Sequence, residues 1–262
     1  MNASSLYERR KVEVPMTMHD GHRRRLRERF RLEGIENFQP HEVLELLLFY
    51  ARARGDVNPL AHRLLDVFGS LKGVLEAPVD QLCAVEGVGE ETATLISMMV
   101  PMFRRYEMCL CEKTQKLAHY SDAQNYCRAL LTGLRKERFY VISVSSQMKI
   151  LGQRVVAEGS LSEVPAYPRL VVETALNHNA YGVILCHNHP GGEAVPSMGD
   201  VDVTRALEGM LSKLGIALMD HIIVADGSTY SLVQHGDYQC SITRGGKQWY
   251  FREDDGWDDA QT

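Results

Sequence analysis

The pattern of hydrophobic and polar positions divides the chain into a helical first part and a mixed second part. Residues 40–53 are too apolar for a surface helix and predict the central helix of a small bundle. After residue 137, short β-rich segments alternate with stretches whose apolar residues recur at helical spacing. The order strand, strand, helix, strand, helix, strand, strand predicts a mixed sheet with helices packed against it.

One predicted strand runs directly into a pair of histidines. Residues 183–186 are all apolar and indicate a buried strand, followed by His187 and His189. Residues two apart in a strand point to the same face, so both imidazoles can be directed at one point. Ser197 and Asp200 then precede an amphipathic helix over residues 201–214. A serine followed three residues later by an acid is also a capping box, which places Asp200 in the first helical turn, where the helix can fold back over the strand end.

These three side chains have the composition of a metal site. Two neutral imidazoles and one carboxylate leave a fourth tetrahedral position open, as in catalytic zinc sites. Either histidine alone is more often an ordinary residue, and a capping box needs no metal. The two interpretations of Asp200 are compatible because a carboxylate has two oxygens. Their combination predicts one zinc ion per chain, bound by His187, His189 and Asp200.

The complete stretch His-Asn-His-Pro-x-Gly-x3-Pro-Ser-x2-Asp resembles the metal motif of the JAMM (MPN-plus) metallohydrolases, and it is closest to the bacterial RadC family. The resemblance implies that His187, His189 and Asp200 bind zinc and that Ser197 stabilises a tetrahedral intermediate. It also implies a curved mixed sheet flanked by helices. The RadC family carries a DNA-repair label, which these residues do not themselves explain.

The resemblance further implies an upstream glutamate that activates a water molecule at the zinc. Glu137 matches this position, two residues before an aromatic residue that begins the first strand. Glu158 is an alternative carboxylate near the same sheet, and Glu173 lies on a predicted helix. The family pattern favours Glu137 as the general base.

Residues 85–93 resemble a helix-hairpin-helix motif. Gly87 and Gly89 permit a tight turn whose backbone N–H groups could hold a phosphate. However, Glu86, Glu90 and Glu91 flank the turn without an adjacent Lys or Arg, and these acids would repel a phosphate. We therefore expect the motif as a structural element and regard DNA binding by it as weakened.

A basic helix is predicted at residues 21–30. Arg23, Arg24 and Arg25 could contact the phosphates of a nucleic acid. Alternatively, the helix is solvated and packs Leu26 and Phe30 against the core. The sequence leaves both interpretations open.

Composition narrows the class of protein. The chain has 262 residues, 45% of them hydrophobic and 24% charged, which is ordinary for a globular protein. Its net charge of −5 argues against bulk electrostatic binding to nucleic acid. The sequence shows neither a signal peptide nor an apolar run long enough to span a membrane, so we expect a cytoplasmic protein. Its six cysteines form no Cys-x-x-Cys pair and are expected to be reduced core residues.

Five segments are expected along the chain. Residues 1–20 are predicted to be a flexible tail, 21–111 a helical domain with the helix-hairpin-helix, and 112–120 a polar linker. Residues 121–240 are predicted to be the JAMM/MPN-like metal domain, and 241–262 an acidic tail.

The leading functional hypothesis is a zinc-dependent hydrolase that cleaves an amide bond in a peptide or protein substrate that the sequence does not identify. An alternative is a DNA-associated binding protein in which the metal site is structural. A metal-dependent nuclease that uses the same ligands on a phosphodiester is a third possibility.

Overall fold

The structure is a computed structural model. It describes residues 18–112, 116–117, 119–159, 167–244, 247–252 and 256–259, and within them the side chains of 21–111, 116–117, 119–159 and 168–240. The chain forms two compact units, Met1–Met99 and Val100–Thr262. The tail predicted at residues 1–20 lies outside the described residues except for its last three, and so do residues 113–115 and 118 of the predicted linker.

The first unit is helical, as expected. Its helices are α1 (Met18–Glu33), α2 (Pro40–Ala51), α3 (Asn58–Phe68), α4 (Leu71–Glu76), α5 (Val79–Cys83) and the first part of α6 (Glu90–Glu112). The apolar run predicted to be a helix is α2, which packs against α1, α3 and α4. The core of the unit includes several leucines of these helices, among them Leu44, Leu48 and Leu64, each 0% exposed.

The second unit contains the predicted mixed sheet. Its five strands are β1 (Arg138–Val144), β2 (Ile150–Glu158), β3 (Gly182–Asn188), β4 (Ala217–Ala225) and β5 (Ser228–Ser231), in the order β2-β1-β3-β4-β5. All neighbours are antiparallel except β3 and β4, which are parallel. The prediction of a mixed sheet with flanking helices is confirmed.

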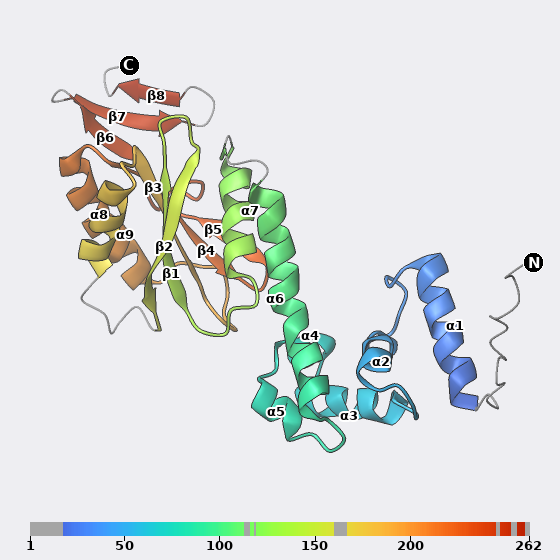
Figure 1. The fold of residues 1–262 in the computed structure, drawn as a ribbon. Helices are drawn as coiled ribbons and strands as arrows, with labels where there is room; N and C mark the ends of the chain where they lie inside the picture. Colours follow the sequence, from blue (N-terminus) through green and yellow to red (C-terminus); the bar gives the residue numbers. More distant parts are fainter. Residues whose placement is uncertain are drawn as a thin grey trace, which may run out of the picture. The chain divides into compact units, whose positions relative to one another are not determined.

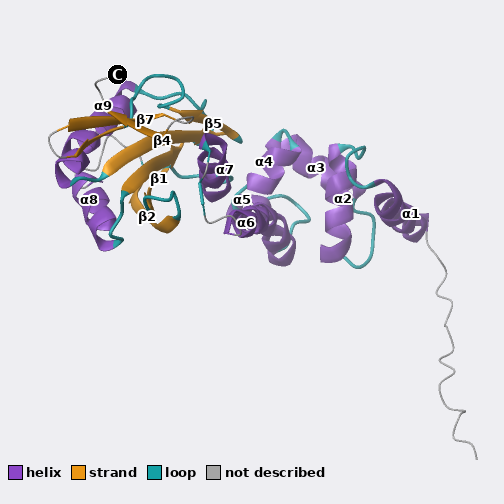
Figure 2. Cartoon of the chain, turned by 90° about the horizontal axis from the view of Figure 1, so that it is seen from above, coloured by secondary structure: helices purple, strands orange, loops and turns teal. Residues whose placement is uncertain are grey.

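Helices cover both faces of this sheet. Figures 1 and 2 show α7 (Tyr120–Leu131) on one face and the pair α8 (Tyr167–Asn177) and α9 (Met198–Leu211) on the other. Every residue of β3 and β4 is buried, because these strands are central and covered on both sides. This burial explains their near-continuous apolar sequence.

The single parallel pair requires a crossover connection, and α9 provides it. The helix leaves the end of β3, continues into a 3₁₀ turn (Ser212–Leu214) and ends at Gly215, whose φ of 71° is the left-handed conformation that glycine favours. One face of α9 is buried, with Asp200, Thr204, Leu207 and Leu211 all at most 1% exposed. The crossover thus brings the first turn of α9 to the carboxyl end of β3.

Residues 241–262, predicted to be an acidic tail, contain three short strands. These are β6 (Ser241–Arg244), β7 (Lys247–Arg252) and β8 (Gly256–Asp259), which form a separate antiparallel sheet. Among the helices that the structure describes, none combines the length and the apolarity that a membrane span needs.

Candidate metal centre

The two histidines of the motif lie where β3 ends. His187 is fully buried, opposite Phe139 of β1 and Ile223 of β4. The backbone N–H of His189 donates to the carbonyl of Val224 at 2.9 Å and so extends the β3–β4 pairing by one residue. The strand geometry therefore directs both imidazoles to one side, and their Nε2 atoms lie 2.8 Å apart. Two ring nitrogens directed at one point suit a shared cation.

Asp200 meets these histidines from the first turn of α9. The predicted capping box is confirmed, because the Ser197 hydroxyl accepts from the Asp200 N–H and the Asp200 carboxylate accepts from the Ser197 N–H. The bond from the Ser197 N–H to Asp200 Oδ2 is 2.7 Å long, and the Ser197 hydroxyl donates to the same oxygen at 2.6 Å. The capping function therefore uses Oδ2 and leaves Oδ1 available for another partner.

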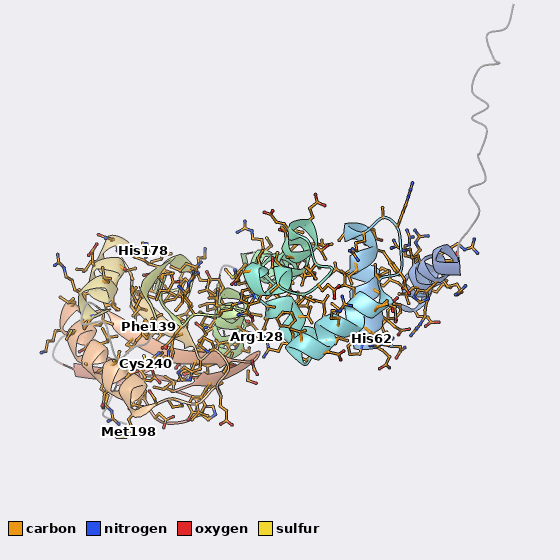
Figure 3. The ribbon with its side chains drawn as sticks, turned by 90° about the horizontal axis from the view of Figure 1, so that it is seen from below. His62, Arg128, Phe139, His178, Met198 and Cys240 are labelled. Atoms are coloured by element: carbon orange, nitrogen blue, oxygen red, sulfur yellow. The ribbon has the colours of Figure 1, made fainter. Side chains whose placement is uncertain are left out.

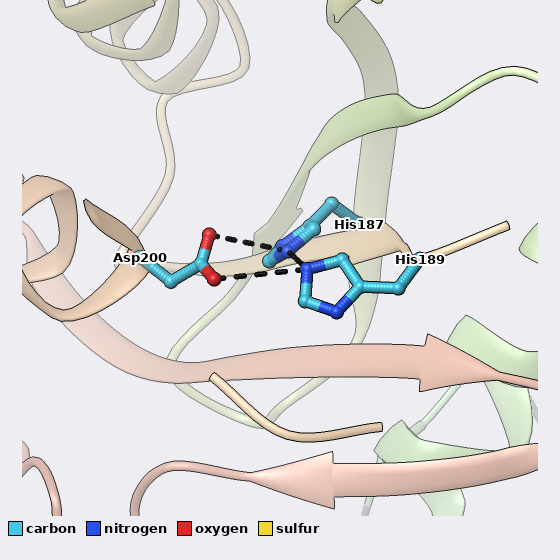
Figure 4. A group of neighbouring side chains, drawn as sticks. All are labelled: His187, His189 and Asp200. Atoms are coloured by element: carbon cyan, nitrogen blue, oxygen red, sulfur yellow. Dashed lines mark hydrogen bonds and ion pairs between the residues drawn. The ribbon is translucent and has the colours of Figure 1, made fainter. Parts of the chain in front are cut away.

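The remaining oxygen of Asp200 faces the imidazoles (Figure 4). Oδ1 lies 3.2 Å from His187 Nε2, and Oδ2 lies 3.7 Å from His189 Nε2. One ligand atom from each of the three residues fits within a 4.8 Å cluster. Within the described part of the chain, Oδ1 is the buried side-chain polar atom that has no hydrogen-bond partner. A buried carboxylate oxygen in this condition is costly unless a cation neutralises it, so the donor set fits a metal ion.

The protonation of His187 suits a metal ligand. Burial lowers the pKa of His187 to about 4, although the nearby carboxylate of Asp200 acts in the opposite direction. The imidazole is therefore neutral at physiological pH and has a lone pair to offer.

Glu137 directly precedes β1 and is partly buried. Burial raises the pKa of its carboxyl group, the charge of His189 lowers it, and the charge of Asp200 raises it. Glu137 is not part of the cluster formed by His187, His189 and Asp200. A raised pKa near a site is typical of a group that exchanges protons there.

The alternative carboxylates have other partners. Glu158 lies opposite Arg138 in the β1–β2 pairing, and its Oε2 is 3.4 Å from Arg138 Nε. Glu173 Oε1 of α8 lies 3.4 Å from Arg154 Nη1 of β2. Both are surface ion pairs, since the side chains are 34–45% exposed.

Asn188, between the two histidines, has a role that the sequence analysis missed. Its side chain points to the segment before β1, where its Oδ1 accepts from the Arg138 N–H at 2.8 Å. Its Nδ2 donates to the carbonyls of Leu134 at 3.2 Å and Lys136 at 3.1 Å. These bonds hold the backbone on both sides of Glu137. A polar amide inside a buried strand was the available signal.

His221 and Thr204 were also missed as parts of the site. The Nε2 atom of His221, on β4, lies 2.9 Å from Nδ1 of His187. Its Nδ1 lies 2.7 Å from Thr204 Oγ1 on α9. Thr204 is four residues after Asp200, so a polar residue on the apolar face of the predicted helix was the signal for it.

The residues predicted to contact DNA are differently placed. Arg23 is buried, and its guanidinium donates to the carbonyls of Arg52 and Gly55, both at 2.7 Å. Arg24 and Arg25 are exposed on α1. Leu26 is buried as the core interpretation predicts, whereas Phe30 is 44% exposed. Of the three arginines, only Arg24 and Arg25 have the exposure that phosphate contact requires.

The glycine turn joins α5 to α6. Gly87 has a φ of 93°, which explains the need for glycine there. The three flanking acids Glu86, Glu90 and Glu91 are all exposed. Arg63 of α3 donates to the Glu86 carbonyl at 2.6 Å, and its Nη1 lies 3.7 Å from the carboxylate of the same residue. The one cation brought to the turn by these contacts is thus engaged with an acid.

Comparison with known proteins gives matches over both units. A family model described as a RadC-like JAB domain matches residues 117–237, and one described as the UPF0758 N-terminal region matches residues 20–94. A UPF0758 protein of Ruegeria pomeroyi is 36% identical over 215 residues, which cover 82% of this chain and 96% of that protein. A UPF0758 protein of Rhodobacter capsulatus is 36% identical over 211 residues, covering 80% and 99% respectively.

Proposed function

We propose that this chain, which belongs to the RadC-like UPF0758 family, is a zinc-dependent hydrolase that cleaves an amide bond. The family membership supports a metallohydrolase-type domain. The observation that carries the proposal is the buried, unpartnered Oδ1 of Asp200, which faces the neutral imidazole of His187. Both atoms are electron-pair donors, and a cation between them removes the cost of their proximity.

The metal would be held by His187, His189 and Asp200. When bound, zinc supplies a Lewis acid that polarises a carbonyl and makes a water molecule more acidic. The Oδ2 atom of Asp200 is already held by two bonds from Ser197, so the carboxylate is oriented before any metal binds. Such preorganisation favours a defined geometry at the reacting atoms.

Glu137 is the proposed general base. Its carboxyl would take a proton from water and deliver it to the nitrogen of the leaving amine. The three bonds of Asn188 fix the backbone on both sides of Glu137, which supports a defined position for this residue. Glu158 is a weaker candidate because it is engaged with Arg138.

Ser197 is proposed to stabilise the oxyanion, with a condition. In this structure its hydroxyl proton is donated to Asp200 Oδ2. To donate to a substrate oxyanion, the hydroxyl must turn away, while the Ser197 N–H keeps its own bond to the carboxylate. A hydroxyl donor of this kind is worth roughly 3–4 kcal/mol in the transition state.

The test combines metal content with turnover. Wild-type protein, equilibrated with zinc and freed of excess, should hold about one zinc per chain, and His189→Ala should lose both metal and activity. Glu137→Gln should keep its zinc and lose roughly 10²–10⁴-fold in turnover on a peptide or isopeptide substrate. Glu158→Gln is the matched control and should remain active.

Two results would contradict this function. Absence of bound zinc in the wild type would remove the metallohydrolase assignment. Full activity of Glu137→Gln together with loss of activity in Glu158→Gln would move the general base to Glu158.

A further inference from the structure

A continuous series of hydrogen bonds links two of the proposed metal ligands through Thr204 and His221, which are outside the proposed ligand set. Thr204 Oγ1 lies 2.5 Å from the backbone carbonyl oxygen of Asp200 and 2.7 Å from His221 Nδ1. His221 Nε2 lies 2.9 Å from His187 Nδ1. All four residues are at most 1% exposed. Water therefore cannot take the place of any partner in this chain.

The donor and acceptor of each hydrogen bond in this series follow from the bond to the Asp200 carbonyl. A carbonyl oxygen can only accept, so the single hydroxyl proton of Thr204 is donated to Asp200. The Thr204 oxygen must then accept from His221, which places the His221 proton on Nδ1. The ring is fully buried, with Thr204 at Nδ1 and His187 at Nε2, so a second proton would be a buried charge with no acid at either nitrogen, and the ring carries only that one proton.

His221 Nε2 is consequently an acceptor, and its partner must donate to it. His187 Nδ1 therefore carries a proton, and the lone pair of the ring lies on Nε2, which is 2.8 Å from Nε2 of His189. In this tautomer His187 Nε2 has no proton to donate to Asp200 Oδ1, which lies 3.2 Å away.

We propose that Thr204 and His221 are positioning residues that hold His187 in its Nδ1–H tautomer, so that its Nε2 lone pair is presented to the metal. The inference deepens the proposed function and rests on its metal site. The second ring nitrogen of a metal-binding histidine commonly donates to an oriented acceptor, which fixes the tautomer and the ring. Here the acceptor is His221. Its tautomer is set through Thr204 by the backbone carbonyl of Asp200.

Phe139 of β1 packs against the two imidazoles of this hydrogen-bonded series (Figure 3 shows Phe139 within the second unit). Its ring stacks on His187, with centroids 5.7 Å apart and an interplanar angle of 14°. The same ring meets His221 edge-on, with centroids 5.3 Å apart. The two imidazoles are thus held in place by packing as well as by hydrogen bonds.

The hydrogen bond from Thr204 to the Asp200 carbonyl could be an ordinary helical feature, and the test must distinguish this from a positioning role. Helical threonines often bond to the carbonyl four residues earlier. Thr174 on α8 does so, since its hydroxyl donates to the Leu170 carbonyl at 2.6 Å, and it is 2% exposed. Because Thr174 shares the bond and the burial of Thr204, it supplies a matched control.

The experiment measures tautomers in the metal-free, ¹⁵N-labelled full chain by long-range ¹H–¹⁵N correlation NMR, followed by zinc titration. Wild-type His187 should be the Nδ1–H tautomer. In Thr204→Val, His221 loses its acceptor, its proton moves to Nε2, and His187 is forced into the Nε2–H tautomer. Zinc affinity should then fall roughly 10–100-fold. Thr204→Ser should restore both properties, and Thr174→Val should change neither.

An Nε2–H tautomer of His187 in the wild type would overturn the proposal, as would wild-type tautomer and affinity in Thr204→Val. If Thr204→Val does not fold, the wild-type spectrum still decides. The two proposals fail differently, because the tautomer is read without metal. An Nδ1–H His187 in a protein that binds no zinc would support the hydrogen-bonded chain and contradict the hydrolase.

Discussion

Each unit of the protein buries a carboxylate, and the two carboxylates differ in one respect. Glu45 in the helical unit is 1% exposed, and both of its oxygens have partners. Oε1 accepts from Asn58 Nδ2 at 2.9 Å, and Oε2 lies 2.8 Å from His22 Nε2. Asp200 in the sheet unit is 0% exposed and has partners only on Oδ2. Both carboxylates are buried, but only Glu45 has a hydrogen-bond partner on each oxygen.

The difference separates a structural group from a binding group. A buried carboxylate with two satisfied oxygens can stabilise the fold by fixing its neighbours. One with a bare oxygen raises the free energy of the folded state until something binds. The unsatisfied atom is therefore more informative about function than the burial of the residue.

The largest expected effect comes from exchanging each carboxylate for its amide. Asp200→Asn should weaken zinc binding roughly 100-fold or more, since even residues behind a ligand cost 10–100-fold. Without metal, its free energy of unfolding should stay level or rise, because an uncompensated charge is removed. Glu45→Gln should instead lose about 1–3 kcal/mol of stability and leave zinc affinity unchanged.

Zinc titration and chemical denaturation of the metal-free proteins measure both quantities. The comparison breaks if Asp200→Asn is the less stable variant, or if Glu45→Gln binds zinc more weakly than the wild type.

Replacing Asn188 should give a smaller effect. Like Glu45, Asn188 has hydrogen-bond partners for its side-chain polar atoms, but it lies in the sheet unit. Asn188→Ala leaves two carbonyls and one N–H without their partner, which should cost about 1–3 kcal/mol in the free energy of unfolding. Turnover should fall while zinc affinity is retained, because the segment that carries Glu137 is released.

Stability, turnover and zinc titration test this prediction together. Asn125→Ala, at an exposed position, is the control and should leave all three unchanged. A fall in zinc affinity equal to the fall in turnover would show that Asn188 acts on the ligands rather than on Glu137.

The smallest effect concerns a third buried carboxylate, Asp220 on β4, which is 2% exposed. It accepts from the Ser231 hydroxyl at 2.5 Å and from the backbone N–H groups of His221 and Val233 at 2.7 and 3.2 Å. Burial nevertheless raises the pKa of Asp220 from 3.8 to about 6.

The folded protein therefore binds this proton more tightly than the unfolded chain does. The stabilising contribution is fully present below the unfolded pKa and is lost as the pH rises through about 6. Denaturation of the metal-free protein across a pH series should show the free energy of unfolding falling between pH 3.8 and about 6. The corresponding part of the slope should be absent in Asp220→Asn, and equal slopes in the two proteins would contradict the raised pKa.

The cluster of His187, His189 and Asp200 could be predicted because its members lie in one short segment with regular local geometry. Alternation along a strand aligns His187 and His189, and a helix cap brings in Asp200. Both rules act over a few residues. The order of strands and helices followed from the same kind of local periodicity, so the architecture of the second unit could also be predicted.

The residues that support these ligands depend on contacts between distant parts of the chain. His221 reaches His187 only through the parallel register of β3 and β4, in which it lies beside Leu185. Asn188 reaches the Glu137 segment across some fifty positions. The sequence grouped Arg23 with Arg24 and Arg25 by charge, whereas its burial depends on carbonyls near thirty positions away. No local rule contains such information.

The crossover from β3 through α9 has a consequence for chains that are only partly folded. His187 and Asp200 are 13 positions apart, whereas Glu137 and His187 are 50 apart. Because the entropic cost of closing a loop grows with its length, the ligands can gather in a chain in which β1 has not yet paired with β3. Under the proposed function, such a chain would hold metal without the general base in place. The measured metal content would therefore report the fraction of molecules with an assembled β3–α9 segment. Only turnover would report the fraction with a complete sheet.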